Sequence, residues 1–340
     1  MFTPVCFRSV WCRRFAVHHP TDRCAAGSCC CADGGSMVED LRATARRFSR
    51  RSLFATTGLL GLAAAGAAVS AGVNAAADTD AVQRTLNAHD VGQTVGGVAP
   101  VISTERVYSK SRGREVDLVT ILPPGVPAEN LPVSLLLHGL HGTARTAAVG
   151  NIAGLLAAAV TTRLSPAFGF VALDGGDNYW HDHGTGDDPM SMLVNEVPGW
   201  LAQRRLGGAD GLPFAVTGTS MGGFGAFVYS RRRFEQGRPL SAVATMSPGL
   251  LTSWTEMAKR NAFINADQWA ALDPLRNLDK LGPAPIGLWC GDRDRFIEGC
   301  RRFIATAHPE VGLITPGAHT DEYWSTVTPD VLRFLSRHVG

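Results

Sequence analysis

The chain has 340 residues, of which 45% are hydrophobic and 18% are charged. This composition supplies a large globular core, and it excludes a mainly disordered chain, a collagen-like chain and a polytopic membrane protein. Positive charge is concentrated in residues 1–77, which carry nine Lys and Arg against four Asp and Glu. The rest of the chain is mildly acidic, so its bulk charge gives no indication of nucleic-acid binding.

The first 77 residues have the features of an export leader. The sequence SRRSLF at 49–54 resembles a twin-arginine motif, an Ala- and Gly-rich apolar run follows it, and AAA at 75–77 is a cleavage site of the A-x-A type. The apolar run is long enough for a membrane anchor, but Ala and Gly contribute little to insertion, so cleavage is favoured. Residues 1–36 precede the signal and are untranslated if Met37 is the start. We therefore expect the twin-arginine machinery to export a mature chain of residues 78–340 to the cell envelope or beyond.

The cysteines follow the same division. Six lie within the first 31 residues, with irregular spacing and no C-x-x-C pair, so they do not indicate a metal site. Cys290 and Cys300 are the two in the mature part. Because a disulfide persists outside the cytosol, we favour a bond between them.

Short apolar runs alternate with longer segments of helical period along residues 114–338. The first run, 114–122, alternates as a half-solvated strand does. The next runs are almost wholly apolar, as in strands that helices cover on both faces: 133–137, 168–173, 214–218, 242–246, 286–290 and 311–315. The expected helices are 145–163, 189–206, 222–234, 295–307 and 321–338. This order predicts an α/β protein with a mostly parallel, doubly wound sheet, whose ligand site lies at the carboxyl ends of the strands.

Residues 249–282 break this alternation. They contain several large apolar side chains, among them Trp254 and Trp269, and no strand pattern. We expect a small helical insertion over the carboxyl edge of the sheet, within a single mature domain.

A candidate nucleophile follows the strand at 214–218. Gly218-Thr219-Ser220-Met221-Gly222 is a G-x-S-x-G motif between a strand and a helix, the context in which a serine is presented at a sharp turn. Glycines are needed two residues to either side of Ser220 because such a turn leaves no room for side chains. The helix start directly after Ser220 also offers backbone N–H groups to negative charge.

A serine nucleophile requires a base and an acid, expected later in the chain in the order acid, then histidine. His319 directly follows the strand at 311–315, whereas His308 and His338 fall at helix ends. Asp292 and Asp294 both follow the strand at 286–290. One of them could instead cap the next helix, and we favour Asp294 as the catalytic acid with Asp292 as the alternative.

The strand at 133–137 leads into His138-Gly139-Leu140-His141-Gly142. The glycines allow the backbone to approach a substrate carbonyl closely, so the N–H groups of Leu140 and Met221 are the candidate oxyanion donors. We expect His138 to shape this loop rather than to act as a base.

The loop after the strand at 168–173 combines aromatic and polar residues. Asp174 and Trp180, together with His138, are the expected substrate-binding residues. A metal site is the alternative for its acids and histidines (Asp177, His181, His183, Asp187 and Asp188), but their spacing matches no recognised ligand pattern, so a turn-forming loop without a metal is favoured.

Together the motifs GTSMGGFGA, HGLHG, LWCGDRDRF and PGAHTDEYW resemble the α/β-hydrolase superfamily over residues 104–338, and within it the esterase family that includes esterase D and the antigen 85 mycolyltransferases. The resemblance implies an α/β-hydrolase fold, with Ser220 as nucleophile, Asp294 as acid, His319 as base, and Leu140 and Met221 as oxyanion donors. The Gly-Gly after Met221 is closer to esterase D than to the mycolyltransferases.

The expected activity is therefore that of a cofactor-independent serine carboxylesterase acting on a small-molecule or lipid acyl ester. An envelope acyltransferase that passes the acyl group to a sugar or lipid hydroxyl is the alternative. A non-catalytic envelope-binding protein is less favoured, although fold alone does not fix function.

Overall fold

The computed structural model describes residues 95–184 and 186–340. The expected leader, with its twin-arginine motif and six cysteines, lies outside the described residues. Among the helices of the described ranges, none is both long and apolar enough to cross a membrane.

The centre of the described chain is an eight-stranded sheet in the order β1-β2-β4-β3-β5-β6-β7-β8. The first two strands and the pairing of β2 with β4 are antiparallel, and all other neighbours are parallel. The strands are β1 Val101–Ser109, β2 Arg114–Leu122, β3 Val133–Leu137, β4 Gly169–Leu173, β5 Ala215–Thr219, β6 Ala242–Met246, β7 Ile286–Gly291 and β8 Val311–Thr315. The expected mostly parallel sheet is thus present, and β2, β3, β6 and β8 have the predicted bounds.

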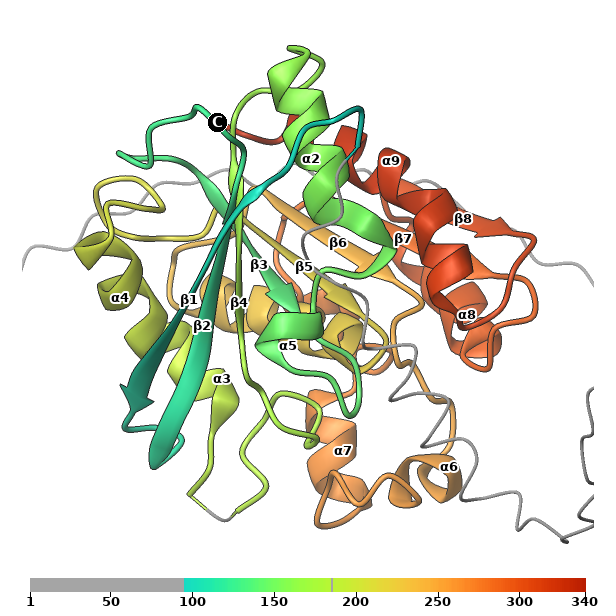
Figure 1. The fold of residues 1–340 in the computed structure, drawn as a ribbon. Coiled ribbons are helices and arrows are strands. Elements are labelled where there is room, and N and C mark those ends of the chain that lie inside the picture. The colour runs from blue at the N-terminus through green and yellow to red at the C-terminus, as the bar shows by residue number, and fades with distance from the viewer. Residues whose placement is uncertain (1–94, 185) are drawn as a thin grey trace, which may run out of the picture. The chain divides into compact units, whose positions relative to one another are not determined.

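Helices cover both faces of this sheet (Figure 1). One face carries two short 3₁₀ turns, η1 Ala144–Thr146 and η2 Val149–Asn151, with α2 Ile152–Thr161 and α9 Asp321–Arg337. The other carries α3 Pro189–Ser191, the π-helical turn η3 Met192–Glu196, α4 Val197–Gln203, α5 Met221–Glu235 and α8 Ile297–Ala307. Successive side chains of a strand point to opposite faces, so the neighbours Leu135 and Leu136 belong to separate core clusters. This two-sided burial explains why the central strands are mostly apolar.

Residues 249–282 contain α6 Trp254–Ala258, α7 Ala266–Leu272 and the 3₁₀ turn η4 Leu278–Lys280, and no strand. Figure 1 shows α6 and α7 together beyond one end of the sheet, and each is capped by a polar side chain, Ser253 and Asn265 respectively.

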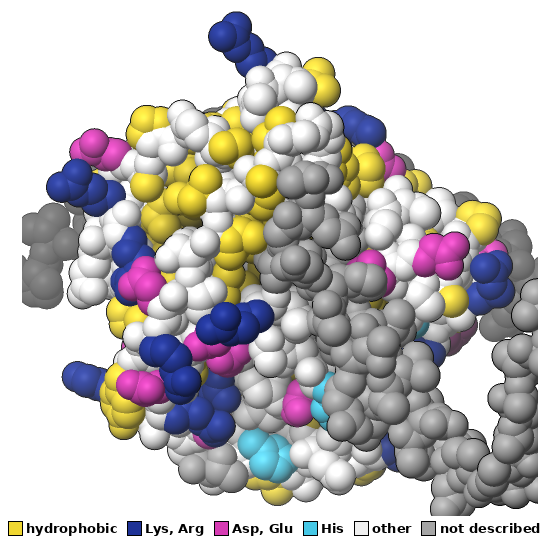
Figure 2. All heavy atoms as spheres, viewed as in Figure 1, with side chains coloured by type: hydrophobic (Ala, Val, Ile, Leu, Met, Phe, Trp, Pro, Cys, Tyr) yellow, Lys and Arg dark blue, Asp and Glu magenta, His cyan; other side chains and the backbone are white. Residues whose placement is uncertain are grey.

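Strand β1 is absent from the sequence-based expectation. Most of its residues are exposed, so it lacks the apolar signal of the central strands. Among the described strands it pairs with β2 alone, and two of its residues form ion pairs: Arg106 with Glu115, and Glu105 with Arg204. Figure 2 shows positive and negative side chains intermixed around this hairpin. Charge on an edge strand opposes pairing with another chain, which accounts for its polar composition.

The favoured disulfide is not present in the structure. Cys290 and Cys300 are buried free thiols, and their sulfur atoms lie near the carbonyl oxygens of Gly291 and Pro248, at 3.6 and 3.9 Å. Burial and the neighbouring Cys290 raise the pKa of the Cys300 thiol well above its usual value. Both cysteines therefore serve as small apolar core residues rather than as a cross-link.

Candidate active site

Ser220 occupies a sharp turn between β5 and α5. Its backbone has φ 57° and ψ −121°, a conformation that side-chain-bearing residues rarely adopt and that is typical of strained functional sites. A Cβ at Gly218 would lie 2.1 Å from the carbonyl oxygen of Gly222, and a Cβ at Gly222 would lie 1.9 Å from that of Leu137. Both glycines of the G-x-S-x-G motif are therefore sterically required.

Three residues from different strand ends meet at this turn. His319 Nε2 lies 2.9 Å from Ser220 Oγ, and His319 Nδ1 lies 2.8 Å from Asp294 Oδ2. Because a carboxylate only accepts, Nδ1 carries the proton that it donates to Asp294, which leaves Nε2 to accept from the Ser220 hydroxyl. The side chain of His319 is only 7% exposed and that of Asp294 is fully buried. This is the geometry of an activated serine nucleophile.

The structure separates the two candidate acids. Asp294 contacts His319, whereas Asp292 Oδ1 accepts a hydrogen bond from the Gly317 N–H at 3.0 Å and lies 3.3 Å from the guanidinium of Arg293. Asp292 therefore holds the loop that leads to His319, and it does not contact the imidazole.

The electrostatic surroundings keep Asp294 ionised and His319 neutral. Burial raises the pKa of Asp294, but hydrogen bonds from His319, the Phe296 N–H and the Ser247 hydroxyl lower it by more. The net pKa is therefore below its usual value. Burial lowers the pKa of His319 below 6.5, and the neighbouring Asp294 opposes this shift only in part. A neutral imidazole is the form that can accept the serine proton.

Sequence reasoning missed the residues that hold this pair in place. The Trp324 indole N–H donates to Ser247 Oγ at 3.0 Å, and the same hydroxyl bonds to Asp294. The Trp324 ring also packs edge-on against His319, with centroids 5.2 Å apart, and Phe296 packs against it at 5.1 Å. Ser247 directly follows β6, so its place at a strand end was the available signal.

The HGLHG loop lies against the nucleophile. A Cβ at Gly139 would approach the Ser220 Cβ to 3.3 Å, so only glycine lets the loop come this close without displacement. The N–H groups of Leu140 and Met221 donate no hydrogen bond to other protein groups described between residues 95 and 340. Met221 is the first residue of α5, where N–H groups have no partner within the helix. Both groups can therefore serve an incoming oxyanion.

The three expected substrate-binding residues form hydrogen bonds within the protein. His138 is 2% exposed, with Nδ1 2.8 Å from the Gly139 carbonyl oxygen and Nε2 accepting from the Gly175 N–H at 2.9 Å. Trp180 is fully buried, and its indole N–H donates to the His138 carbonyl at 3.2 Å.

Asp174 accepts from the N–H groups of Asp117 and Ala144 at 3.0 and 2.8 Å. The polar atoms of His138, Asp174 and Trp180 thus bond within the protein, and their contact with a substrate stays a prediction. Trp180 bonds to the first residue of the HGLHG loop, and Asp174 joins β2 to η1. Burial lowers the pKa of His138, consistent with the neutral ring that these contacts require.

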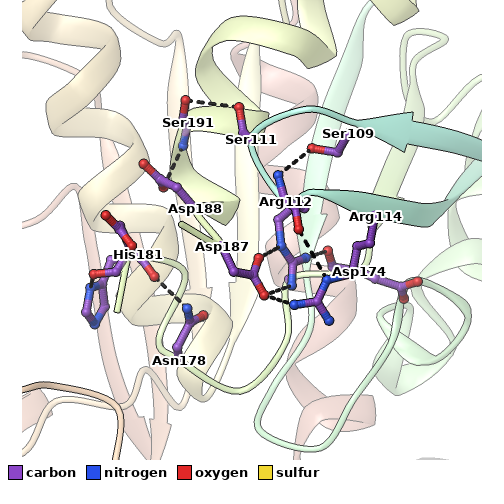
Figure 3. A network of polar contacts seen from close by, with 12 residues as sticks. Ser109, Ser111, Arg112, Arg114, Asp174, Asn178, His181, Asp187, Asp188 and Ser191 are labelled. Atoms are coloured by element: carbon purple, nitrogen blue, oxygen red, sulfur yellow. Dashed lines mark hydrogen bonds and ion pairs between the residues drawn. The ribbon is translucent and has the colours of Figure 1, made fainter. Parts of the chain in front are cut away.

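An ion-pair network fixes the loop after β4 (Figure 3). The buried Arg112 guanidinium bonds to the Asp187 carboxylate and to the Asp174 carbonyl, and Arg114 pairs with the same Asp187. At the other end of the loop, Asp177 accepts from the His141 N–H at 2.6 Å. These hydrogen bonds and ion pairs link the β1–β2 turn, through the loop after β4, to the HGLHG loop. Sequence spacing alone does not show this connection.

The candidate metal ligands of this loop have separate partners. Asp177 bonds to His141 and Asp187 to Arg112. His181 Nε2 and His183 Nδ1 both face the Ala262 carbonyl oxygen, and Asp188 accepts from the Ser191 N–H. In residues 95–184 and 186–340, no group of three or more His, Cys, Asp or Glu side chains could hold a metal ion.

Comparisons with known proteins agree with this architecture. Residues 109–307 match the family model described as "Putative esterase", a range that includes Ser220 and Asp294 and ends before His319. No curated protein matches the sequence. Similar solved structures include a ferulic acid esterase, with 20% identity, a TM-score of 0.54, and coverage of 72% of this chain and 100% of that one.

An S-formylglutathione hydrolase from Agrobacterium tumefaciens has 18% identity and a TM-score of 0.54, covering 73% of this chain and 98% of its own. An α/β-hydrolase from the Lake Arreo metagenome has 17% identity and a TM-score of 0.56, covering 78% and 90% respectively. At these identities the likeness shows the fold alone, and the fold is that of the α/β hydrolases.

Proposed function

Because the chain belongs to the "Putative esterase" family and is by that membership an ester-hydrolysing enzyme, we propose that it is a serine carboxylesterase whose reaction runs through an acyl-enzyme on Ser220. The observation that carries the proposal is the continuous hydrogen-bond path from Ser220 through His319 to Asp294. Fold alone would not support it, since one fold hosts many activities.

Acylation follows from this path. Ser220 Oγ attacks the ester carbonyl while its proton passes to His319 Nε2, and Asp294 stabilises the imidazolium that forms. The carbonyl oxygen becomes negative, and the N–H groups of Met221 and Leu140 donate to it. Collapse of this intermediate expels the alcohol, which takes the proton from Nε2 and leaves the acyl group on Ser220.

Deacylation repeats the same steps with water. His319, neutral again, accepts a proton from a water molecule as its oxygen attacks the acyl carbon. The second intermediate collapses, the proton returns to Ser220 Oγ, and the free acid leaves. His319 accepts and returns the proton in every step, so the proposed reaction uses no cofactor.

The experiment is hydrolysis of a chromogenic acyl ester by the purified protein and its variants. Ser220→Ala is expected to lower kcat/KM by at least about a thousandfold. Ser325→Ala, which removes an exposed hydroxyl that bonds only to Asp321 O, is the matched control and keeps full activity. Release of free acid supports hydrolysis, whereas an acyl ester formed with an added sugar would identify the enzyme as an acyltransferase. Undiminished activity of Ser220→Ala would overturn the proposal.

Export is a separate proposal, which the residues at 46–77 support by their arginine pairs, apolar run and cleavage site. Replacing Arg50 and Arg51 by lysine is expected to retain the protein inside the cell. Unchanged export of this variant would contradict the twin-arginine route.

A further inference from the structure

Two arginines lie one aromatic ring away from the proposed general base. Arg260 follows α6, in the insertion at 249–282, and Arg295 directly follows Asp294. Their guanidinium carbons lie 6.0 and 5.7 Å from the centroid of the Phe296 ring. The Phe296 ring in turn packs edge-to-face on His319, at 5.1 Å. Two separate segments therefore bring positive charge to the Phe296 ring, which contacts His319.

Neither guanidinium has an acidic partner within the described part of the chain. Arg260 Nε is buried and has no hydrogen-bond partner at all. By contrast, the nearby Arg112 and Arg114 both pair with Asp187. A buried guanidinium N–H without an acceptor lowers stability, and the contact of the Arg260 guanidinium with the Phe296 ring offsets part of this cost.

The two charges also act on each other and on the base. Partial burial and the charge of Arg260 lower the pKa of Arg295. Both arginines add to the burial that lowers the pKa of His319. A bound anion beside the guanidinium groups would relieve this mutual repulsion.

A cleft beside Arg260 provides the space. It has a volume of about 430 Å³, and its lining includes Asn178, Asn261 and Asp177. Asp177 also accepts a hydrogen bond from the backbone N–H of His141, so one wall of the cleft contacts the HGLHG loop. Asp187 on its wall pairs with Arg112 and Arg114, and Asp177 bonds to His141, so among the described residues Arg260 forms no ion pair with either carboxylate.

We propose that the ester substrate carries a free carboxylate, which Arg260 and Arg295 bind while Ser220 attacks the ester carbonyl. The inference rests on the proposed esterase activity and adds the chemical class of its substrate. Arginine is suited to this task because its planar fork donates two parallel hydrogen bonds to a carboxylate.

The test compares charged and neutral esters of matched shape. On the acyl side the probes are the 4-nitrophenyl monoester of adipic acid and 4-nitrophenyl hexanoate. On the alcohol side they are 4-acetoxybenzoate and 4-acetoxybenzamide. We expect kcat/KM for the carboxylate member of at least one pair to exceed that of its neutral partner by about tenfold, as one charge-assisted hydrogen bond provides.

Variants locate the source of this preference. Arg260→Gln, alone or with Arg295→Gln, is expected to lower the ratio of charged to neutral kcat/KM about tenfold, mainly through KM. Arg301→Gln removes one exposed positive charge from α8 and leaves the ratio unchanged. If the arginine variants do not fold, the wild-type ratio still tests the proposal, because it must fall when NaCl is raised.

The outcomes separate the two claims. Hydrolysis of the neutral esters with no preference for either carboxylate, or a preference that Arg260→Gln leaves intact, would overturn the inference while the esterase activity stands. Failure to hydrolyse any of the four probes would overturn the proposed function, and the inference with it.

Discussion

The indole N–H of Trp324 donates to the hydroxyl of Ser247 over 3.0 Å, and through that hydroxyl the tryptophan acts on Asp294. The same indole ring packs against His319. One side chain of α9 thus positions both partners of the proposed nucleophile.

This relationship predicts a graded loss of activity. Ser247→Ala removes one hydrogen bond from the Asp294 carboxylate and is expected to lower kcat about tenfold with KM unchanged, since a bond to a charged group contributes about 1.5 kcal/mol or more. Trp324→Phe keeps a ring beside His319 but loses the N–H, and it should give a smaller decrease. Equal kcat in Ser247→Ala and wild type would show that the hydroxyl does not position Asp294.

The two acids are distinguished by isosteric substitutions. Asp294→Asn is expected to lower kcat by about 10³ to 10⁴, because an amide cannot hold the His319 tautomer in which Nε2 accepts a proton. Asp292→Asn retains an oxygen that can accept from the Gly317 N–H, so its kcat should stay within about twofold of wild type. The assignment of the acid is wrong if the two variants exchange these effects.

The pH dependence follows from His319. Its pKa is lowered from 6.5 by burial, and only the neutral form accepts the serine proton. Activity is therefore present above this pKa and is lost as the pH falls through it. The acidic limb of kcat/KM against pH should have its midpoint below 6.5, and a midpoint above that value would contradict the described surroundings of the ring.

The ion pairs of Arg112 and Arg114 should differ in their contribution to stability. The Arg112 side chain is 2% exposed, and its removal leaves the Asp187 carboxylate and the Asp174 carbonyl without a buried donor. Arg112→Ala is expected to lower the free energy of unfolding by about 3 kcal/mol.

Arg114 is the matched control, because its side chain is 56% exposed and it pairs with the same carboxylate. Arg114→Ala should cost less than about 1 kcal/mol. Denaturant unfolding of both variants measures the two losses in the free energy of unfolding. Equal losses would show that the buried Arg112 contributes no more to stability than the exposed Arg114.

The sequence was informative where one local pattern determines one structure. Buried strands such as β3 and β6 are almost wholly apolar, and the glycines around Ser220 reflect close contacts of a single turn. Strand β1 escaped prediction because it is exposed and stabilised by pairing with β2 and by surface charge.

The active site was predictable only in part, because it too depends on contacts that no local pattern determines. A loop of aromatic and polar residues indicates proximity to a site but not which way each side chain points, so it did not show that Trp180 bonds to His138 and Asp174 to Ala144. Ser247, Trp324 and Arg260 act through contacts between residues far apart in the chain, and no spacing in the sequence encodes those contacts.

The central claim is that Ser220 forms a covalent intermediate, and labelling with a fluorophosphonate tests it most directly. The reagent reacts with a serine that a neighbouring base activates. Mass spectrometry of the digested protein should find a single adduct on the peptide that contains Ser220 in the wild type, and none on that peptide in Ser220→Ala. An active wild-type enzyme whose adduct lies on another residue, or that carries none at Ser220, would contradict the account.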